Sequence, residues 1–338
     1  MGVRPGCSWI APRSIVCFCV DVELGSSAGR YDALALLGPT ASGKTDLALA
    51  LAEQGPVDIV NMDSAQVYRG MDIGTAKPEL AVRQRIPHHL FDVVDPAEAY
   101  SAGRFVEEAQ AVIRAIRRAG RIPLLVGGTW LYYRALRDGL APLPPAVPGV
   151  RDKLAERAAH LGWPSLHAEL VRIDPAAGQR IHPHDAQRIQ RALEVWEVTG
   201  IPLSVHWTRA RHQGLALRTL VLIPDHRDWL HRRIAQRLEA MFAAGFVEEV
   251  AGLRARSDLH PDLPALRAVG YRQVWTCLDG RLPRERLFQA VLEATRQFAK
   301  RQITAMRPLT AVDMLDPADE TARTRAVADF QRRFESLG

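Results

Sequence analysis

One eight-residue segment constrains the fold more than any other part of the chain. Residues 38–45 read Gly-Pro-Thr-Ala-Ser-Gly-Lys-Thr and match the pattern G-x-x-x-x-G-K-[ST] at every fixed position. The segment follows the short apolar run 33–37 and precedes the Ala- and Leu-rich stretch 44–53. A motif placed between a buried strand and a helix predicts a phosphate-binding loop, and with it an α/β fold.

The residue types of this loop suit phosphate chemistry. Glycines let the backbone wrap closely around an anion, while backbone N–H groups and the helix N-terminus point toward it. Lys44 would place a positive charge on the outer phosphate, and Thr45 would bind Mg²⁺. The predicted diphosphate-binding or triphosphate-binding residues are Gly38, Pro39, Thr40, Ala41, Ser42, Gly43, Lys44 and Thr45. The motif does not say what the phosphates carry.

Strands and helices alternate around the loop. The predicted strands, which are short apolar runs, are 33–37, 57–62, 89–94, 122–126 and 217–223. The predicted helices are 44–53, 104–119, 229–242 and 284–306. This order predicts a P-loop NTPase-like core, in which helices flank a parallel sheet.

A second, all-helical part interrupts the core. Four prolines between residues 140 and 148 resemble a linker, and residues 151–199 show helical periodicity alone before a strand returns at 217. The predicted organisation is an N-terminal extension (1–31, expected to be disordered), a core (32–139 and 213–316), an inserted helical subdomain (140–212) and a C-terminal tail (317–338).

Composition narrows the function classes only moderately. The net charge of +6 agrees with an anionic partner, although an arginine-rich composition explains it equally well. No apolar run approaches the roughly 20 residues that span a bilayer, so no membrane partner is expected. The spacing of Cys7, Cys17, Cys19 and Cys277 fits neither a zinc site nor a disulfide framework. We expect a cytoplasmic monomer with free thiols.

A carboxylate follows the second predicted strand. The strand 122–126 ends in Gly127-Gly128-Thr129, without the acidic residue that a typical P-loop ATPase has there, whereas Asp63 ends the neighbouring strand. Small-molecule P-loop kinases place an aspartate at this point to bind or deprotonate a substrate hydroxyl. The residues therefore indicate a phosphate cradle beside a potential general base rather than a motor protein.

The stretch from Asp63 to Pro78 reads Asp-Ser-Ala-Gln-Val-Tyr-Arg-Gly-Met-Asp-Ile-Gly-Thr-Ala-Lys-Pro. It resembles the signature of bacterial tRNA dimethylallyltransferases, also called tRNA isopentenyltransferases. Further segments match in the same order, and they are 125–129, 180–183, 187–188, 191–194, 267–273 and 300–304. The resemblance extends from about residue 34 to 314, and it leaves out the extension and the tail.

The resemblance implies a reaction and its partners. Members of this family use Mg²⁺ and dimethylallyl diphosphate to modify the adenosine just 3′ of the anticodon, in tRNAs that read codons beginning with U. The phosphate loop holds the donor's diphosphate, and the helical insertion binds the anticodon stem-loop. The resemblance assigns Asp63 as the base, Lys44 to the leaving diphosphate, Thr129 to both substrates, and Arg237 to the diphosphate. Taken alone, Arg237 would more often belong to a solvated helix face.

The family's RNA-binding positions are also carried over by resemblance. They correspond to Asp63, Ser64, Ala65, Gln66, Thr129, Arg151, Gln187, Arg188, Ile189, Gln190, Arg191, Arg267, Ala268, Val269, Gly270, Tyr271, Arg272, Lys300, Arg301, Gln302, Ile303, Thr304, Ala305, Met306 and Arg307. Two departures are that Ala305 stands where the family usually has tryptophan, and His184 where it often has asparagine.

Two other functions stay open from the residues. A P-loop kinase would use Asp63 on the hydroxyl of a small metabolite, and a non-catalytic RNA-binding protein would carry a vestigial loop. The intact Lys44, Thr45 and Asp63 speak against the second alternative. A metal site at His182, His184 and Asp185 is not expected, since further ligands at a suitable spacing are missing from the sequence.

Overall fold

The computed structural model describes residues 31–208 and 214–335. It divides into a core unit, formed by the chain up to Tyr133 and from Ala216 onward, and a helical unit, Arg134–Leu215. The helical unit thus begins and ends a few residues outside the predicted insertion 140–212. Apart from Tyr31, the predicted extension 1–31 lies outside the described residues.

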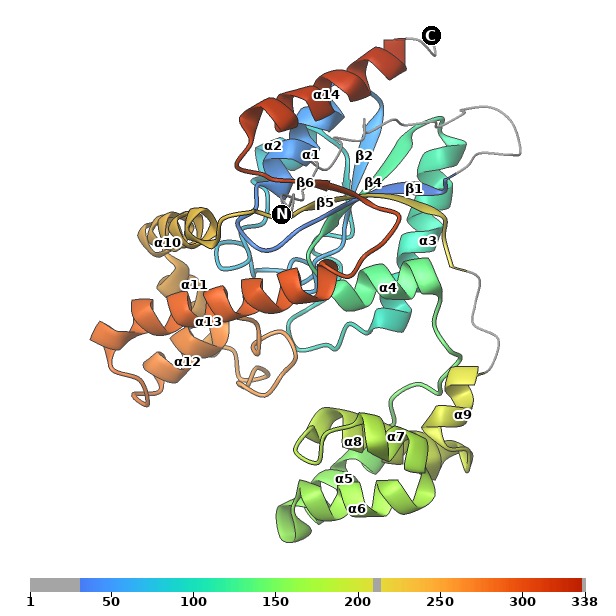
Figure 1. Ribbon diagram of the computed structural model, residues 1–338. Helices are drawn as coiled ribbons and strands as arrows, with labels where there is room; N and C mark the ends of the chain where they lie inside the picture. The colour runs from blue at the N-terminus through green and yellow to red at the C-terminus, as the bar shows by residue number, and fades with distance from the viewer. Residues whose placement is uncertain (1–30, 209–213, 336–338) are drawn as a thin grey trace, which may run out of the picture. The chain divides into compact units, whose positions relative to one another are not determined.

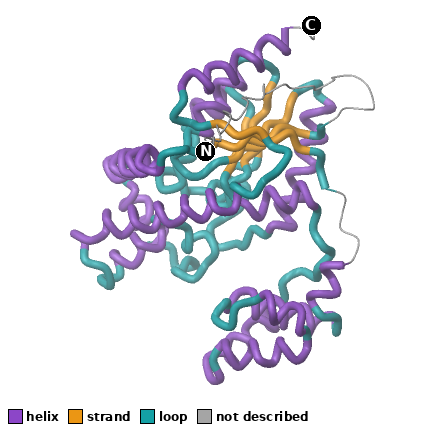
Figure 2. The backbone as a smooth tube through the Cα atoms, in the orientation of Figure 1, coloured by secondary structure: helices purple, strands orange, loops and turns teal. Residues whose placement is uncertain are grey.

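A six-stranded parallel sheet forms the centre of the core unit (Figures 1 and 2). Its strands are β1 (Ala33–Leu37), β2 (Val57–Asn61), β3 (His88–His89), β4 (Ile122–Gly127), β5 (Leu217–Leu222) and β6 (Asp313–Leu315). They lie in the order β3-β2-β4-β1-β5-β6, and every pairing is parallel. Since helices cover both faces, the central strands are continuous apolar runs. The predicted parallel α/β core is confirmed.

The prediction of a strand over 89–94 was wrong. The strand ends after His89, because Leu90 and Asp92 have positive φ angles of 63° and 55°, which an extended strand does not accept. Further along the chain, Val94 forms an isolated parallel bridge with Tyr68, outside the named strands.

Two layers of helices enclose the sheet. On one face, Leu34 and Leu36 belong to a cluster with Leu47 and Leu51 of α1 (Lys44–Glu53). Side chains alternate along a strand, so Ala35 and Leu37 face the opposite layer, where α3 (Ala102–Arg118) contacts β2 and β4. The short helices α2 (Leu80–Arg85) and α4 (Trp130–Asp138) lie in the connections.

The C-terminal half of the core unit is a helical layer. It comprises α10 (Arg227–Ala243), α11 (Phe246–Arg254), α12 (Tyr271–Leu278) and α13 (Arg284–Met306), of which α13 packs against both α10 and α12. The predicted helices over 229–242 and 284–306 are confirmed. The segment 317–338, predicted as a C-terminal tail, contains α14 (Glu320–Glu335), which packs against α1 (Figure 1).

The helical unit has its own hydrophobic core. It contains α5 (Pro148–Leu161), α6 (Trp163–Ile173), α7 (Pro175–Arg180), α8 (Ala186–Thr199) and α9 (Leu203–Thr208). Leu154, Leu166, Leu170 and Leu193 pack together inside it. In the described part of the chain, none of the helices combines the length and the apolar character needed to cross a membrane.

Candidate active site

The phosphate loop lies where β1 ends and α1 begins. Gly43 is the N-cap residue of α1 with φ 84°, a left-handed conformation that glycine adopts without strain, and Ala41 also has a positive φ of 61°. A side chain on Gly38 would lie 2.9 Å from the carbonyl oxygen of Leu222, so glycine is required there for the close approach of β5. The amides of the first turn of α1 have no partner within the helix and are available to an anion.

The loop also carries a cation with unusual acid–base behaviour. The amine of Lys44 donates a hydrogen bond to the carbonyl oxygen of Pro39 at 2.6 Å. Burial lowers its pKa to about 7; the carboxylate of Asp63 acts in the opposite direction, and Arg237 lowers the pKa further. Burial likewise lowers the pKa of Arg237, against the attraction of Asp63. Two cations held at a desolvation cost, without enough negative charge to balance them, favour an anionic ligand.

A side chain from the far end of the sequence completes the loop. Gln302 of α13 is buried; its carbonyl oxygen accepts from the amide of Thr40 at 2.9 Å, and its amide donates to the carbonyl oxygen of Gly128 at 3.0 Å. Gln302 thus connects the phosphate loop to the end of β4. Pro39 has no N–H, and the N–H of Thr40 is engaged by Gln302. The amide of Ser42 donates to the carbonyl oxygen of Pro39 at 3.3 Å, which leaves the amides of Ala41, Gly43 and Lys44 for an anion at this loop.

Asp63 lies at the carboxyl end of β2, beside the ends of β1 and β4. The buried side chain of Asn61 fixes its backbone by accepting from the Asp63 amide at 2.9 Å and donating to the Asp63 carbonyl oxygen at 3.2 Å. One carboxylate oxygen of Asp63 accepts from the amide of Ala65 at 2.9 Å. Thr129 binds the next residue, because its hydroxyl accepts from the Ser64 amide at 2.9 Å. The structure therefore brings Asp63 and Thr129 to one edge of the sheet.

Lys44, Asp63 and Arg237 line one cavity of about 360 Å³ within the core unit, whereas Thr129 is not among its lining residues. Its polar side contains Thr40, Lys44, Thr45, Asp63 and Arg237. The apolar part of the lining consists of Ile234, Leu238, Met241, Phe246, Val291 and Phe298. A ligand that fits both sides has an anionic head and a short hydrocarbon body.

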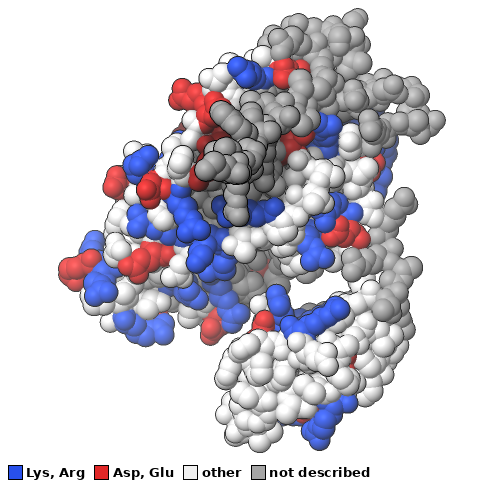
Figure 3. All heavy atoms as spheres, in the orientation of Figure 1, with Lys and Arg blue, Asp and Glu red and all other residues white. Residues whose placement is uncertain are grey.

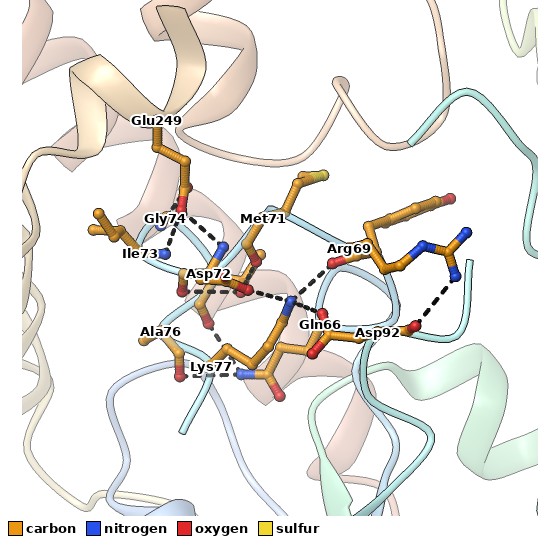
Figure 4. A network of polar contacts seen from close by, with 12 residues as sticks. Gln66, Arg69, Met71, Asp72, Ile73, Gly74, Ala76, Lys77, Asp92 and Glu249 are labelled. Carbon is orange, nitrogen blue, oxygen red and sulfur yellow. Dashed lines mark hydrogen bonds and ion pairs between the residues drawn. The ribbon is translucent and has the colours of Figure 1, made fainter. Parts of the chain in front are cut away.

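The signature stretch contributes another wall of this cavity. Gly74, Thr75 and Ala76 line it, and the carbonyl oxygen of Thr75 accepts hydrogen bonds from Gln66 at 3.0 Å and from Arg237 at 3.2 Å. Figure 4 shows this loop held by Lys77 on one side and Glu249 on the other. The sequence did not single out Lys77 or Glu249 for a role. Lys77 stands in the signature, whereas Glu249 shares its helix turn with Glu248 and the sequence does not distinguish them.

Two further stretches predicted to bind RNA border the same cavity. The residues of these stretches that line the cavity are Arg267, Ala268, Val269, Gly270, Tyr271, Arg301 and Gln302. Those exposed on the surface are Arg267, Arg272, Lys300, Arg301, Thr304 and Arg307. Figure 3 shows Lys and Arg side chains gathered on the face that carries α13. Ile303 and Ala305 are half-buried, whereas Tyr271 and Met306 are fully buried, so the side chains of these last two pack inside the protein.

The remaining predicted RNA-binding residues belong to the helical unit. Gln187 and Arg188 are exposed at the start of α8, whereas Ile189 is fully buried in the core of the unit. Arg151 and Arg191 both form ion pairs with the buried carboxylate of Glu194, at 2.8 and 2.6 Å, and remain partly exposed.

Gln190 also has a contact inside the helical unit. Its side chain donates to the carbonyl oxygen of Arg151 at 3.0 Å. Three of the polar residues predicted to bind RNA, namely Arg151, Gln190 and Arg191, are thus oriented by bonds within the unit.

Sequence comparison finds close relatives over most of the chain. The chain is 58% identical over 281 residues to a tRNA dimethylallyltransferase of Alkalilimnicola ehrlichii, covering 82% of this chain and 88% of that protein. It is 53% identical to the enzyme of the same name from Paracidovorax citrulli, covering 87% and 89%.

Solved structures with the same fold carry similar descriptions. The full-length tRNA isopentenylpyrophosphate transferase of Bacillus halodurans matches with a TM-score of 0.62 at 33% identity, covering 90% of this chain and 98% of that chain. A eukaryotic dimethylallyltransferase acting on tRNA matches with a TM-score of 0.72 at 27% identity, covering 86% and 74%.

The fold and the cavity define an α/β protein of the P-loop type, in which the loop 38–45 and the carboxylate of Asp63 line a cavity that also has apolar lining residues. The IPP transferase family model matches residues 66–308, and the isopentenyl transferase model matches residues 31–86. The chain belongs to the IPP transferase family.

Proposed function

We propose that this protein transfers the dimethylallyl group of dimethylallyl diphosphate to the exocyclic N6 amine of the adenosine 3′-adjacent to the anticodon, in tRNAs reading UNN codons. The observation that carries the proposal is the cavity itself, where Lys44 and Arg237 meet Asp63 beside an apolar wall. The names of the relatives support the same reaction. The partners are dimethylallyl diphosphate and the tRNA anticodon stem-loop, bound by a monomer in the cytoplasm.

The reaction needs a base and a stabilised leaving group. The adenine amine is a poor nucleophile, because its lone pair is delocalised into the ring. As the bond from N6 to C1 of the prenyl group forms, the carboxylate of Asp63 accepts the N6 proton and the bond from C1 to the diphosphate oxygen breaks. We assign Thr129 the orientation of the substrates, a role supported by its hydrogen bond to the amide of Ser64, the residue after Asp63.

The departing diphosphate takes up the negative charge. Lys44, Arg237 and the amides at the start of α1 stabilise it, because these donors are already in position and partly desolvated. The hydroxyl of Thr45, at the first turn of α1 and lining the cavity, is a hard oxygen ligand that suits Mg²⁺.

The protein offers few other ligands for this ion. In the described residues, no group of three or more His, Cys, Asp or Glu side chains gathers to hold a metal. Phosphate oxygens and waters would therefore supply most ligands of Mg²⁺, since this cation usually keeps several waters when bound. When bound, Mg²⁺ neutralises part of the diphosphate charge.

The kinase alternative is less well supported. A nucleoside triphosphate needs a longer row of donors than a diphosphate, yet Gln302 occupies the amide of Thr40. The apolar wall of Ile234, Leu238 and Met241 also suits a hydrocarbon better than a polar metabolite.

The test is to incubate the protein with Mg²⁺, dimethylallyl diphosphate and a synthetic anticodon stem-loop, and to weigh the RNA. We expect one five-carbon group to be added, and a stem-loop with guanosine in place of the target adenosine to stay unmodified. Unchanged RNA, or phosphoryl transfer from ATP to a small metabolite without RNA, would refute the proposal.

A further inference from the structure

We propose that Glu249 is a positioning residue for the diphosphate group, because its carboxylate fixes the loop 72–76, which in turn holds Arg237 against the cavity. This inference rests on the proposed role of Arg237 as a ligand of the diphosphate. Glu249 lies in the first turn of α11, outside every segment on which the family resemblance was based.

The carboxylate of Glu249 binds three consecutive backbone amides of the loop. Oε2 accepts from Asp72 at 2.8 Å and from Ile73 at 2.7 Å, and Oε1 accepts from Gly74 at 3.1 Å (Figure 4). The hydroxyl of Tyr271 donates to Oε1 at 2.5 Å. Four donors converge on one side chain, which leaves the loop little freedom to move relative to α11 and α12.

Close packing holds the same loop from the cavity side. A side chain at Gly74 would lie 2.1 Å from a ring carbon of Phe246 and 2.6 Å from a ring carbon of Tyr271, so the backbone rests directly on both rings. Phe246 begins α11, three residues before Glu249. The start of this helix therefore contacts the loop through both a ring and a carboxylate.

The other side of the loop is fixed by a buried ammonium group. Lys77 forms ion pairs with Asp72 and with Asp92, each at 2.5 Å, and donates to the carbonyl oxygen of Tyr68 at 2.8 Å (Figure 4). Asp92 also pairs with Arg83 at 2.6 Å. The loop is thus anchored at Asp72 from two directions, and Gly74 is held by Glu249 and the two rings. Thr75 follows Gly74 directly and is held by Gln66 and by its own hydroxyl, which donates to the carbonyl oxygen of Met71 at 2.7 Å.

The anchored loop presents one acceptor to the site. The carbonyl oxygen of Thr75 follows directly after the amides held by Glu249, and it accepts from the guanidinium of Arg237 at 3.2 Å and from the amide of Gln66 at 3.0 Å. With one nitrogen bound there, the remaining guanidinium donors can be directed at an anion. Displacement of Thr75 would free Arg237 to swing toward solvent.

The chemistry of the site requires a carboxylate. All four partners of Glu249 are donors, so an acceptor-only side chain satisfies them, whereas glutamine would turn an NH₂ group toward an N–H or the Tyr271 hydroxyl. The negative charge is also favoured at the N-terminus of α11.

The experiment compares Glu249→Ala and Glu249→Gln with Glu248→Ala in the full-length chain. Glu248 lies in the same helix turn, and among the described contacts of loop 72–76 it is not a partner. The measurements are the dissociation constant of inorganic diphosphate with Mg²⁺ by calorimetry, and KM and kcat for dimethylallyl diphosphate. We expect Glu249→Ala to weaken diphosphate binding and raise the donor KM by about tenfold, with a smaller change in kcat. Glu249→Gln should be intermediate, and Glu248→Ala should match the wild type.

A merely structural role would reduce the folded fraction and hence the apparent kcat, while leaving KM and the dissociation constant unchanged. Wild-type diphosphate affinity and donor KM in folded Glu249→Ala would overturn the inference. If that variant does not fold, Tyr271→Phe and Glu249→Gln decide the matter, and wild-type diphosphate affinity in both would overturn it. If the wild type binds diphosphate but does not prenylate RNA, the proposed function fails while this comparison still tests Glu249.

Discussion

The helical unit contains a buried charge whose removal should destabilise it measurably. Glu194 is fully buried in α8 and accepts from Arg151 at 2.8 and 3.0 Å, from Arg191 at 2.6 Å, and from the amide of Val147 at 2.8 Å. Burial by itself would raise the pKa of this carboxyl, but the two arginines and the amide outweigh it and hold the pKa below its ordinary range.

The magnitude follows from how exposed the partners are. Removing one member of a fully buried ion pair costs roughly 3–5 kcal/mol, because the other charge stays behind without a partner. Here the side chains of Arg151 and Arg191 are 41% and 26% exposed, so water can partly replace the lost contacts. We therefore expect Glu194→Ala to lower the free energy of unfolding by about 3 kcal/mol.

The assay is urea unfolding of the full-length chain, with hydrogen exchange followed in α5 and α8. The control is Glu197→Ala, because Glu197 is on the same helix and has a longer contact to Arg157, at 3.5 Å. A surface pair of this kind contributes about 0.5 kcal/mol. Loss of Glu194 should also weaken binding of the anticodon stem-loop, since Arg151 and Arg191 lose their common anchor.

The pH dependence has a defined sign. A carboxyl whose pKa is depressed in the folded state contributes stability above its unfolded pKa and loses it as the pH falls through the folded value. Glu194→Gln should therefore flatten the acid limb of stability against pH. Stability of Glu194→Ala within about 1 kcal/mol of the wild type, or an unchanged acid limb in Glu194→Gln, would refute this reasoning.

Three further predictions concern the active site. Asp63→Ala should keep its affinity for the stem-loop but lose at least about 100-fold in turnover, measured by single-turnover prenylation; unchanged turnover would exclude Asp63 as the base. Because the pKa of Lys44 is about 7, the affinity of the free enzyme for diphosphate, measured by calorimetry, should fall as the pH rises above that value. Lys44→Arg should remove this pH dependence, and an identical pH profile of affinity in the wild type and the variant would contradict the prediction. Gln302→Leu should raise the donor KM by about tenfold through loss of the Thr40 contact, whereas Gln297→Leu, on the exposed side of α13, should not; equal KM values would count against the role of Gln302.

Much of the core could be predicted from short-range patterns. The bounds of α13 and of α1 agree with the sequence prediction, because an apolar stripe at helical spacing and the residues that end it lie within a few positions of one another. The strand at 33–37 was equally clear from its uninterrupted apolar run. By contrast, β3 is shorter than predicted because two residues after it take left-handed φ angles. The sequence did not predict α14, because this segment is strongly charged and packs against α1, which is distant in the sequence.

The roles of individual polar side chains were less accessible. Gln302 was assigned to RNA by resemblance, yet its side chain holds the phosphate loop 262 residues away. Glu249 had no distinguishing signal, although it binds a loop 177 residues away. A hydrogen bond between such distant residues leaves no local period in the sequence, and a glutamate on a helix turn has the same local pattern whether it faces water or a backbone.

The sequence by itself determined that a loop with the phosphate-binding pattern joins a strand to a helix, because the motif at 38–45 depends on local backbone geometry and on the amides at a helix N-terminus. It also determined the family, through the signature at 63–78. Tertiary structure alone decided that Glu249 and Gln302 support the loops around the cavity that Asp63 and Arg237 line. The reason is physical: parallel strands bring their carboxyl ends to one edge, and only the packing of α10, α11 and α13 over that edge selects which distant side chains reach it.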